Sequence, residues 1–349
     1  MINYNRFLNI IYGIEVPNGR LNTSSPEVEK NPSGFDNITF TKKVDGRGYS
    51  SAVSLKKPMK NYMKQKGFEI SEYKKEGKKI IVAANPAKYL NEDVFGVMRA
   101  DKEQITEEEY NNLDNDIKKI YSKPKKGKSE RNITKKRRAT FMMNGLIGVN
   151  RNKVKTEWGV CDTQGDSDSM PYRLETYSDI MVGLANFNIN KTSSFTISDN
   201  ETEFRDYSSE EASALHISEN LSKEEKFKRI AVTLRVLEYL SVQSNQSNYL
   251  VDTMPKIVIL GEYKYGNNVF QGLINKNGIN IEGLKEVISE FDNFRNSNIW
   301  IGVSNRILNE SFQGLKEKLQ RELQEYDFIK IGSVKNAFDG YIDYLKETL

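Results

Sequence analysis

The chain of 349 residues contains 52 lysines and arginines against 48 aspartates and glutamates, which gives a net charge of +4. Its mean hydropathy of −0.65 is low, but 10% of the residues are aromatic, so the composition favours a packed core over a disordered chain. One histidine, His216, and one cysteine, Cys161, exclude a His-rich or Cys-rich zinc site and an internal disulfide, and no nucleophile motif accompanies them.

The charge is unevenly distributed along the chain. Lys42–Lys66 has eight basic residues and one acid, a net of +7, and Lys123–Arg138 has nine basic residues and one acid, a net of +8. Because these two windows exceed the total of +4, the remaining residues carry −11. An acidic body with two basic patches favours a polyanionic partner.

Apolar runs are short throughout the sequence. None approaches the roughly 18 residues of a membrane-spanning helix, and the first residues lack an apolar signal region with a small-residue cleavage site. A single cysteine fits a reducing compartment. We therefore expect a soluble cytoplasmic protein.

The first elements alternate strand and helix. Phe7–Val16 reads as a strand, and Asp36–Val44 continues as extended chain after a turn-rich loop. Ser51–Lys64 has helical periodicity; Pro58 lies within it, so either the helix kinks or its regular part begins there. Lys79–Ala84 is predicted as the next strand.

The middle of the chain is more polar. Thr106 and Glu109 form a capping box that predicts a helix extending to Ile120. The basic window Lys123–Arg138 lacks periodicity and reads as a mobile loop. Arg138–Val149 is a strand candidate that two glycines interrupt.

A polar excursion, Asn150–Pro171, precedes a long predicted strand, Tyr172–Ile189. Ser222 and Glu225 form a second capping box before a strongly periodic helix. A strand, Lys256–Tyr263, follows. The rest alternates between helices (Leu284–Phe294, Phe312–Leu323 and a final one) and strands (Ile299–Val303 and Phe328–Ile331).

The strong elements follow the order strand, helix, strand, strand, helix, strand. This is the ferredoxin-like order of RNA-recognition sheets. Long insertions interrupt it at 65–137, after the first helix, and at 150–175, between the middle strands. The predicted class is α+β.

The most suggestive chemistry lies in Asp45–Lys57. Glycines let a backbone approach a ligand closely. Serines at a helix start leave hydroxyls and N–H groups for a phosphate, and lysines follow one turn later. The alternative is an ordinary capped helix with a solvated lysine face.

The same residues resemble a known family. The pattern Gly-Arg-x-Tyr-Ser-Ser-x-x-Ser-Leu-Lys, from Gly46 to Lys56, is similar to the signature of the Cascade backbone family, CRISPR-associated proteins that polymerise along guide RNA. The DevR (type I-B) branch is the most similar. Asp93–Met98 resembles the family's Phe-Gly-x-Met segment, and Arg138–Val149 with Arg173–Ile189 resembles its central strands around a thumb. The likeness runs from Phe7 to about Tyr263.

This resemblance implies a hand-shaped protein, with a ferredoxin-like or RNA-recognition-motif palm, a helical fingers insertion and a thumb insertion. The expected divisions are palm 1–64, fingers 65–137, palm strand 138–149, thumb 150–175, palm 176–263 and a C-terminal segment 264–349 packed on the palm. In relatives, the glycine-serine-lysine segment grips guide phosphates. Carried onto this chain, the phosphate contacts are Lys42, Lys43, Arg47, Ser50, Ser51, Ser54, Lys56 and Lys57.

Three further groups are candidates. Relatives place an RNA-facing loop where this chain has Asn245, Gln246 and Ser247, and a plain polar turn is the alternative. At the end of the fingers, a basic path for DNA or the heteroduplex comprises Lys135, Lys136, Arg137 and Arg138, although a solvated loop has the same composition. Trp158 and Tyr172 flank the thumb. They either stack on nucleobases or belong to the core packing where the thumb joins the palm.

The resemblance implies a non-catalytic subunit that binds CRISPR guide RNA and displaces its nucleotides at regular intervals for target DNA recognition in antiviral defence. Its expected partners are copies of itself and the small, large and RNA-processing Cascade subunits, and it needs no cofactor or metal. A type III-like RNA endonuclease is the rival hypothesis, because Asp36 resembles the catalytic aspartate of those relatives. An RNA-binding protein outside CRISPR is the third.

Overall fold

The computed structural model describes residues 5–24, 38–76, 79–113, 118, 122–151, 153–161, 170–199, 205–242 and 249–349. The chain divides into two compact units. We call the first the sheet unit; it comprises Met1–Gly67, Phe141–Thr192 and Lys223–Leu349. We call the second the ribbon unit; it comprises Phe68–Thr140 and Ser193–Ser222.

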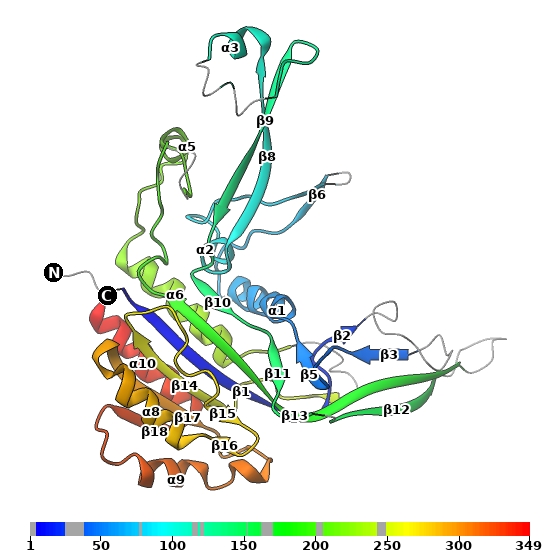
Figure 1. Ribbon diagram of the computed structural model, residues 1–349, viewed down its shortest axis with the longest axis vertical. Coiled ribbons are helices and arrows are strands. Elements are labelled where there is room, and N and C mark those ends of the chain that lie inside the picture. Colours follow the sequence, from blue (N-terminus) through cyan, green and yellow to red (C-terminus); the bar gives the residue numbers. More distant parts are fainter. Residues whose placement is uncertain are drawn as a thin grey trace. The chain divides into compact units, whose positions relative to one another are not determined.

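A large, mostly antiparallel sheet forms the sheet unit (Figure 1). At its centre β1 (Phe7–Gly19) lies antiparallel between β13 (Met170–Asn188) and β14 (Ile257–Tyr263). The other strands are β2 (Thr23–Ser24), β3 (Ile38–Thr41), β4 (Lys43–Val44), β5 (Arg47–Ser50), β10 (Phe141–Met143), β11 (Leu146–Gly148), β12 (Val154–Cys161), β17 (Arg295–Val303) and β18 (Ile329–Gly332). The main path through the sheet runs β18-β17-β14-β1-β13-β11-β5-β4.

Both faces of this sheet are buried in its centre. Every residue from Leu8 to Val16 is buried, with apolar side chains at most positions, which is typical of a strand covered on both sides. Helices α1 (Ala52–Gln65), α6 (Lys223–Glu238) and α10 (Val334–Thr348) pack side by side, α1 on α6 and α6 on α10. Trp300, on β17, stacks edge-on against Tyr341 of α10 with ring centroids 5.6 Å apart, so these helices cover one face.

The opposite face is covered by the C-terminal segment. Ile11 and Ile259 lie in one register row of the sheet and share a core with Leu284 of α8 (Ile281–Phe291) and Leu319 of α9 (Leu315–Glu322). Short strands β15 (Ile274–Asn275) and β16 (Gly278–Ile279) precede α8, and two 3-10 turns, Asp292–Phe294 and Glu310–Phe312, link the later elements. The predicted alternation of helix and strand after Tyr263 is confirmed, within a few residues at each boundary.

The ribbon unit is built on a long antiparallel pair, β8 (Val97–Thr106) with β9 (Lys128–Arg137). A smaller hairpin joins β6 (Lys74–Glu76) to β7 (Lys79–Ile81). Its short helices are α2 (Leu90–Phe95), α3 (Glu107–Asn111) and α5 (Ser209–Ala214). Phe195, Tyr207 and Ala212 form a small core.

Several sequence predictions need correction. The basic window after Lys123 is largely strand β9 and not an aperiodic loop. The capping box of Thr106 and Glu109 is present, but its helix ends at Asn111, far short of Ile120. The polar excursion after Asn150 contains β12, which pairs with the first part of β13.

The mixed α+β class is confirmed by the large sheet and its helices. Helix α1 begins at Ala52 and continues through Pro58, so its regular part does not begin at that proline. Across the described residues, no helix combines the length and apolar character needed to cross a membrane.

Candidate nucleic-acid interface

The glycine-serine-lysine segment folds as a tight hairpin that leads into a helix. Asp45 and Gly46 join β4 to β5 with φ values of 51° and 71°, and positive φ at both central residues matches the type I′ turn of two-residue hairpins. The Asp45 carboxylate forms ion pairs with Arg47, at 3.6 Å, and with the exposed Arg151. The turn therefore presents two guanidinium groups around one carboxylate.

Gly48 allows two neighbouring strands to pack closely. A Cβ at this buried position would lie 3.0–3.1 Å from the ring of Tyr177, on β13. That ring is fixed, because the backbone N–H of Leu21 donates a 3.0 Å hydrogen bond to the Tyr177 hydroxyl. The glycine allows β5 to lie against this buried tyrosine.

The three serines form one hydrogen-bonded cluster. Ser51 is the N-cap of α1, and its hydroxyl accepts from the backbone N–H of Ser54. The Ser54 hydroxyl donates a 2.7 Å hydrogen bond to the Ser51 carbonyl, and it lies 3.1 Å from the Ser50 hydroxyl. Asn22 donates from its side-chain amide to Ser51 and Ser54 at 3.4 and 3.3 Å. Ser50 is fully buried, so only Ser51 and Ser54 retain partial access to a ligand.

Helix α1 presents cations without any acid. Its 14 residues include four lysines and no aspartate or glutamate. Leu55, Met59 and Met63 are buried at helical spacing, which turns Lys57 to solvent and leaves Lys56 half-buried. Burial, together with the charge of Lys60, lowers the pKa of Lys56. The exposed side of this helix is therefore a basic surface.

The two lysines before the hairpin differ from this helix. Lys42 is half-buried. The Lys43 ammonium lies 2.9 Å from Glu175, a nearly buried carboxylate on β13. The Glu175 carboxylate also accepts a 3.0 Å hydrogen bond from the backbone N–H of Thr41. Lys43 thus neutralises a structural carboxylate, which differs from the phosphate contact that the resemblance implies for it.

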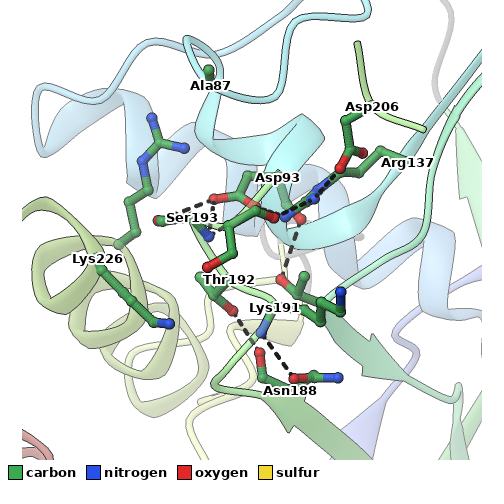
Figure 2. A network of polar contacts seen from close by, with 12 residues as sticks. Ala87, Asp93, Arg137, Asn188, Lys191, Thr192, Ser193, Asp206 and Lys226 are labelled. Carbon is green, nitrogen blue, oxygen red and sulfur yellow. Dashed lines mark hydrogen bonds and ion pairs between the residues drawn. The ribbon is translucent and has the colours of Figure 1, made fainter. Parts of the chain in front are cut away.

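In the ribbon unit, Arg137 also has a structural role. Its guanidinium lies between one buried and one nearly buried carboxylate (Figure 2). It contacts Asp93, and it lies 2.9 Å from Asp206. Asp93 further accepts from the backbone N–H of Ser193, and the Arg137 guanidinium lies 4.9 Å from the ring of Phe195. Arg137 therefore has a structural role, unlike the DNA contact that the sequence predicts.

Its neighbours differ in exposure. Lys135 is paired with Glu211 of α5. Lys136 and Arg138 are exposed. A role in DNA binding stays a prediction for these two residues.

The two thumb aromatics lie on β12 and β13. Trp158 is 61% exposed, and the guanidinium of Arg173 lies 3.7 Å from its ring centroid, in cation–π contact. Tyr172 is half-buried over Gly159, where a Cβ would come within 2.3 Å of its ring. Tyr172 is thus packed across the strands, whereas Trp158 offers an exposed ring.

The remaining candidates, Asn245, Gln246, Ser247 and the rival catalytic residue Asp36, lie outside the described residues.

Sequence reasoning missed two groups beside the segment. Asn22 lies in the predicted turn-rich loop, and only tertiary structure brings it to the N-cap. Asp179 is buried under the backbone of Asn150, whose N–H and side-chain amide donate to it at 3.0 and 2.8 Å. Burial raises the pKa of Asp179, and these hydrogen bonds partly oppose the shift.

Comparisons with known proteins add a likeness in fold. No protein-family model matches the sequence, and no curated protein sequence matches it either. One solved chain, described as "CRISPR RNA-guided surveillance complex, pre-nicking", superimposes with a TM-score of 0.51 and 10% identity, covering 97% of this chain and 100% of that one. Another, "CRISPR RNA-guided surveillance complex", has a TM-score of 0.49 and 11% identity, covering 97% and 99%. At these identities, what the first of them shares with this chain is its fold, nearly from end to end.

Proposed function

We propose that this protein is a non-catalytic backbone subunit of a type I CRISPR surveillance (Cascade) complex, of the I-B-like DevR branch. The observation that carries the proposal is the likeness in fold, over 97% of this chain, to a chain of a surveillance complex that is guided by CRISPR RNA. The basic, acid-free helix α1 behind a serine N-cap supports the same conclusion.

In this proposal, the strands β14, β1, β13 and β10–β11, with α1 and α6, are the ferredoxin-like palm. Their order in the sheet and their antiparallel pairing support it. The ribbon unit supplies the fingers, and the β12–β13 pair supplies the thumb.

The guide RNA runs along the hairpin and the N-terminal half of α1. RNA-recognition motifs stack bases on the open face of their sheet, but here α8 and α9 cover the face opposite α1 and α6. RNA is thereby directed to the β5–α1 edge. Arg47 and Lys57 contribute charge, and the hydroxyls of Ser51 and Ser54 exchange their internal partners for a phosphate.

This interface does not discriminate between RNA sequences. Cations and hydroxyls bind the phosphate backbone of any single strand, which suits a subunit that must accept every guide. Copies of the chain then follow one another along the guide RNA, beside the other Cascade subunits. The guide pairs with target DNA, whose path includes Lys136 and Arg138.

The salt dependence of RNA binding tests this proposal. Replacing Lys56 and Lys57 by alanine should weaken binding of single-stranded RNA and flatten the plot of log affinity against log salt by about 0.7 for each phosphate that is no longer neutralised. The matched control is Lys316→Ala with Lys318→Ala on α9, where one lysine is also half-buried and the other exposed. An unchanged slope in the first variant, or an equal change in the control, contradicts the proposed site.

A further inference from the structure

A pair of tyrosines lies at the far end of the basic helix. Tyr62, on α1, and Tyr239, just after α6, have ring centroids 6.4 Å apart and an interplanar angle of 14°. Tyr239 is 39% exposed and Tyr62 is half-buried. Because α1 packs beside α6 (Figure 1), this pair joins the ends of the two helices. Neither residue belongs to the predicted interface.

The rings line a small pocket together with polar side chains. The pocket has a volume of about 120 Å³, and its lining includes the exposed side chains of Asn61, Gln65 and Ser241. Pockets for drug-sized ligands have volumes of about 300–1,000 Å³, so this smaller pocket suits a guest of about the size of one ring system. The amides and the hydroxyl provide both donors and acceptors for the edge of that ring system.

The orientation of the rings suits a planar guest. The two rings are nearly parallel, with an interplanar angle of 14°. The ring of Tyr239 is 39% exposed, so a base has access to it, and the flat face of any base stacks on such a ring.

Charge around the pocket selects an anionic strand. The four lysines of α1 have no acid among them, and the ammonium of Lys66 lies 5.2 Å from the ring centroid of Tyr62. The carboxylate that precedes Tyr239 in the chain, Glu238, is buried and paired with Arg235. Aromatic rings within a basic surface are the pattern of single-strand binding sites.

We propose that Tyr62 and Tyr239 form a clamp for one unpaired base of a single-stranded nucleic acid whose phosphates follow α1. The clamp rests on the proposed binding of RNA by this helix and adds a base-contacting site to it. Because every base has a π-face, the clamp stacks on any base and does not discriminate between sequences.

The test compares the full-length chain with Tyr239→Ala and Tyr239→Phe by fluorescence anisotropy. The probes are a labelled oligoadenylate of about 12 nucleotides, within the span of single-strand sites, and the same strand with abasic residues, which keeps every phosphate. Tyr265→Ala is the control, since Tyr265 is 56% exposed and packs edge-on against Phe294, with ring centroids 4.8 Å apart, elsewhere in the sheet unit.

The clamp predicts that the wild type prefers the adenylate strand to the abasic strand by about tenfold, that Tyr239→Ala removes most of this preference, and that Tyr239→Phe keeps it. An undiminished preference in Tyr239→Ala overturns the clamp alone. If Tyr239→Ala loses binding to a partner protein but keeps its affinity for RNA, the two tyrosines form a protein contact, and the clamp is also overturned. If the wild type binds neither strand, both the clamp and the proposed function fail.

Discussion

Arg137→Ala provides a sharp test of the ribbon unit, because sequence and structure assign this residue different roles. The sequence predicts a contact with nucleic acid at the end of the fingers. In the structure, its side chain is 5% exposed and lies between Asp93, which is fully buried, and Asp206, which is 9% exposed. The substitution should therefore affect stability before it affects binding.

The expected cost follows from the charge left behind. Removing one partner of a buried ion pair typically costs about 3–5 kcal/mol, because the other charge stays buried without compensation. Here two carboxylates lose their cation, and the substitution also removes the 2.9 Å hydrogen bond to the Ser194 carbonyl. With a urea dependence of about 2 kcal/mol per molar, typical of small domains, a destabilisation of about 4 kcal/mol lowers the unfolding midpoint by about 2 M.

Urea unfolding followed by circular dichroism measures this shift, and hydrogen exchange of peptides from β8 and β9 localises it. The control is Lys136→Ala, the exposed neighbour of Arg137, which should change stability by less than about 0.5 kcal/mol. Asp93→Asn in the Arg137→Ala background should restore part of the stability, because it removes one of the uncompensated charges. Native stability with weakened DNA binding in Arg137→Ala would refute this reasoning.

Three further predictions follow from other sites. Gly48→Ala should cost about 1–3 kcal/mol of unfolding free energy by forcing a methyl group against Tyr177, and an unchanged stability in thermal unfolding would contradict the packing role of this glycine. Burial raises the pKa of Asp179 above its ordinary value of 3.8, so the folded state binds the carboxyl proton more tightly than the unfolded state does. The unfolding free energy therefore falls as the pH rises from 3.8 through the pKa of the folded state. Asp179→Asn should remove this part of the pH profile of stability, and an identical profile in the variant would contradict the raised pKa of Asp179. An assembled complex given complementary RNA and Mg²⁺ should leave the RNA intact, whereas cleavage that Asp36→Ala abolishes would favour the endonuclease hypothesis.

The elements predicted well from the sequence are those with an apolar period. The run from Leu8 to Val16 and the spacing of Leu55, Met59 and Met63 are local signals, and both elements appear where these residues lie. In contrast, β9 has mostly charged and polar side chains, and it is a strand because β8 pairs with it along ten register positions. A local pattern cannot show such a partner.

The candidate site was predictable in part for the same reason. The N-cap at Ser51 is encoded by nearby residues. The roles of Gly48 and Lys43 depend on Tyr177 and Glu175, more than 100 positions later on β13. Charge alone also made Arg137 look like a ligand-binding residue, because a basic residue reads the same in sequence whether it pairs with phosphate or with a buried aspartate.

The central claim is that this chain binds CRISPR guide RNA within a surveillance complex. Its most direct test is to co-express the chain with a CRISPR array and its partner subunits, purify the assembly through this chain, and sequence the RNA that copurifies. The proposal predicts a multi-subunit complex that contains discrete guide RNA and several copies of this chain. Recovery of the free protein without RNA would contradict it.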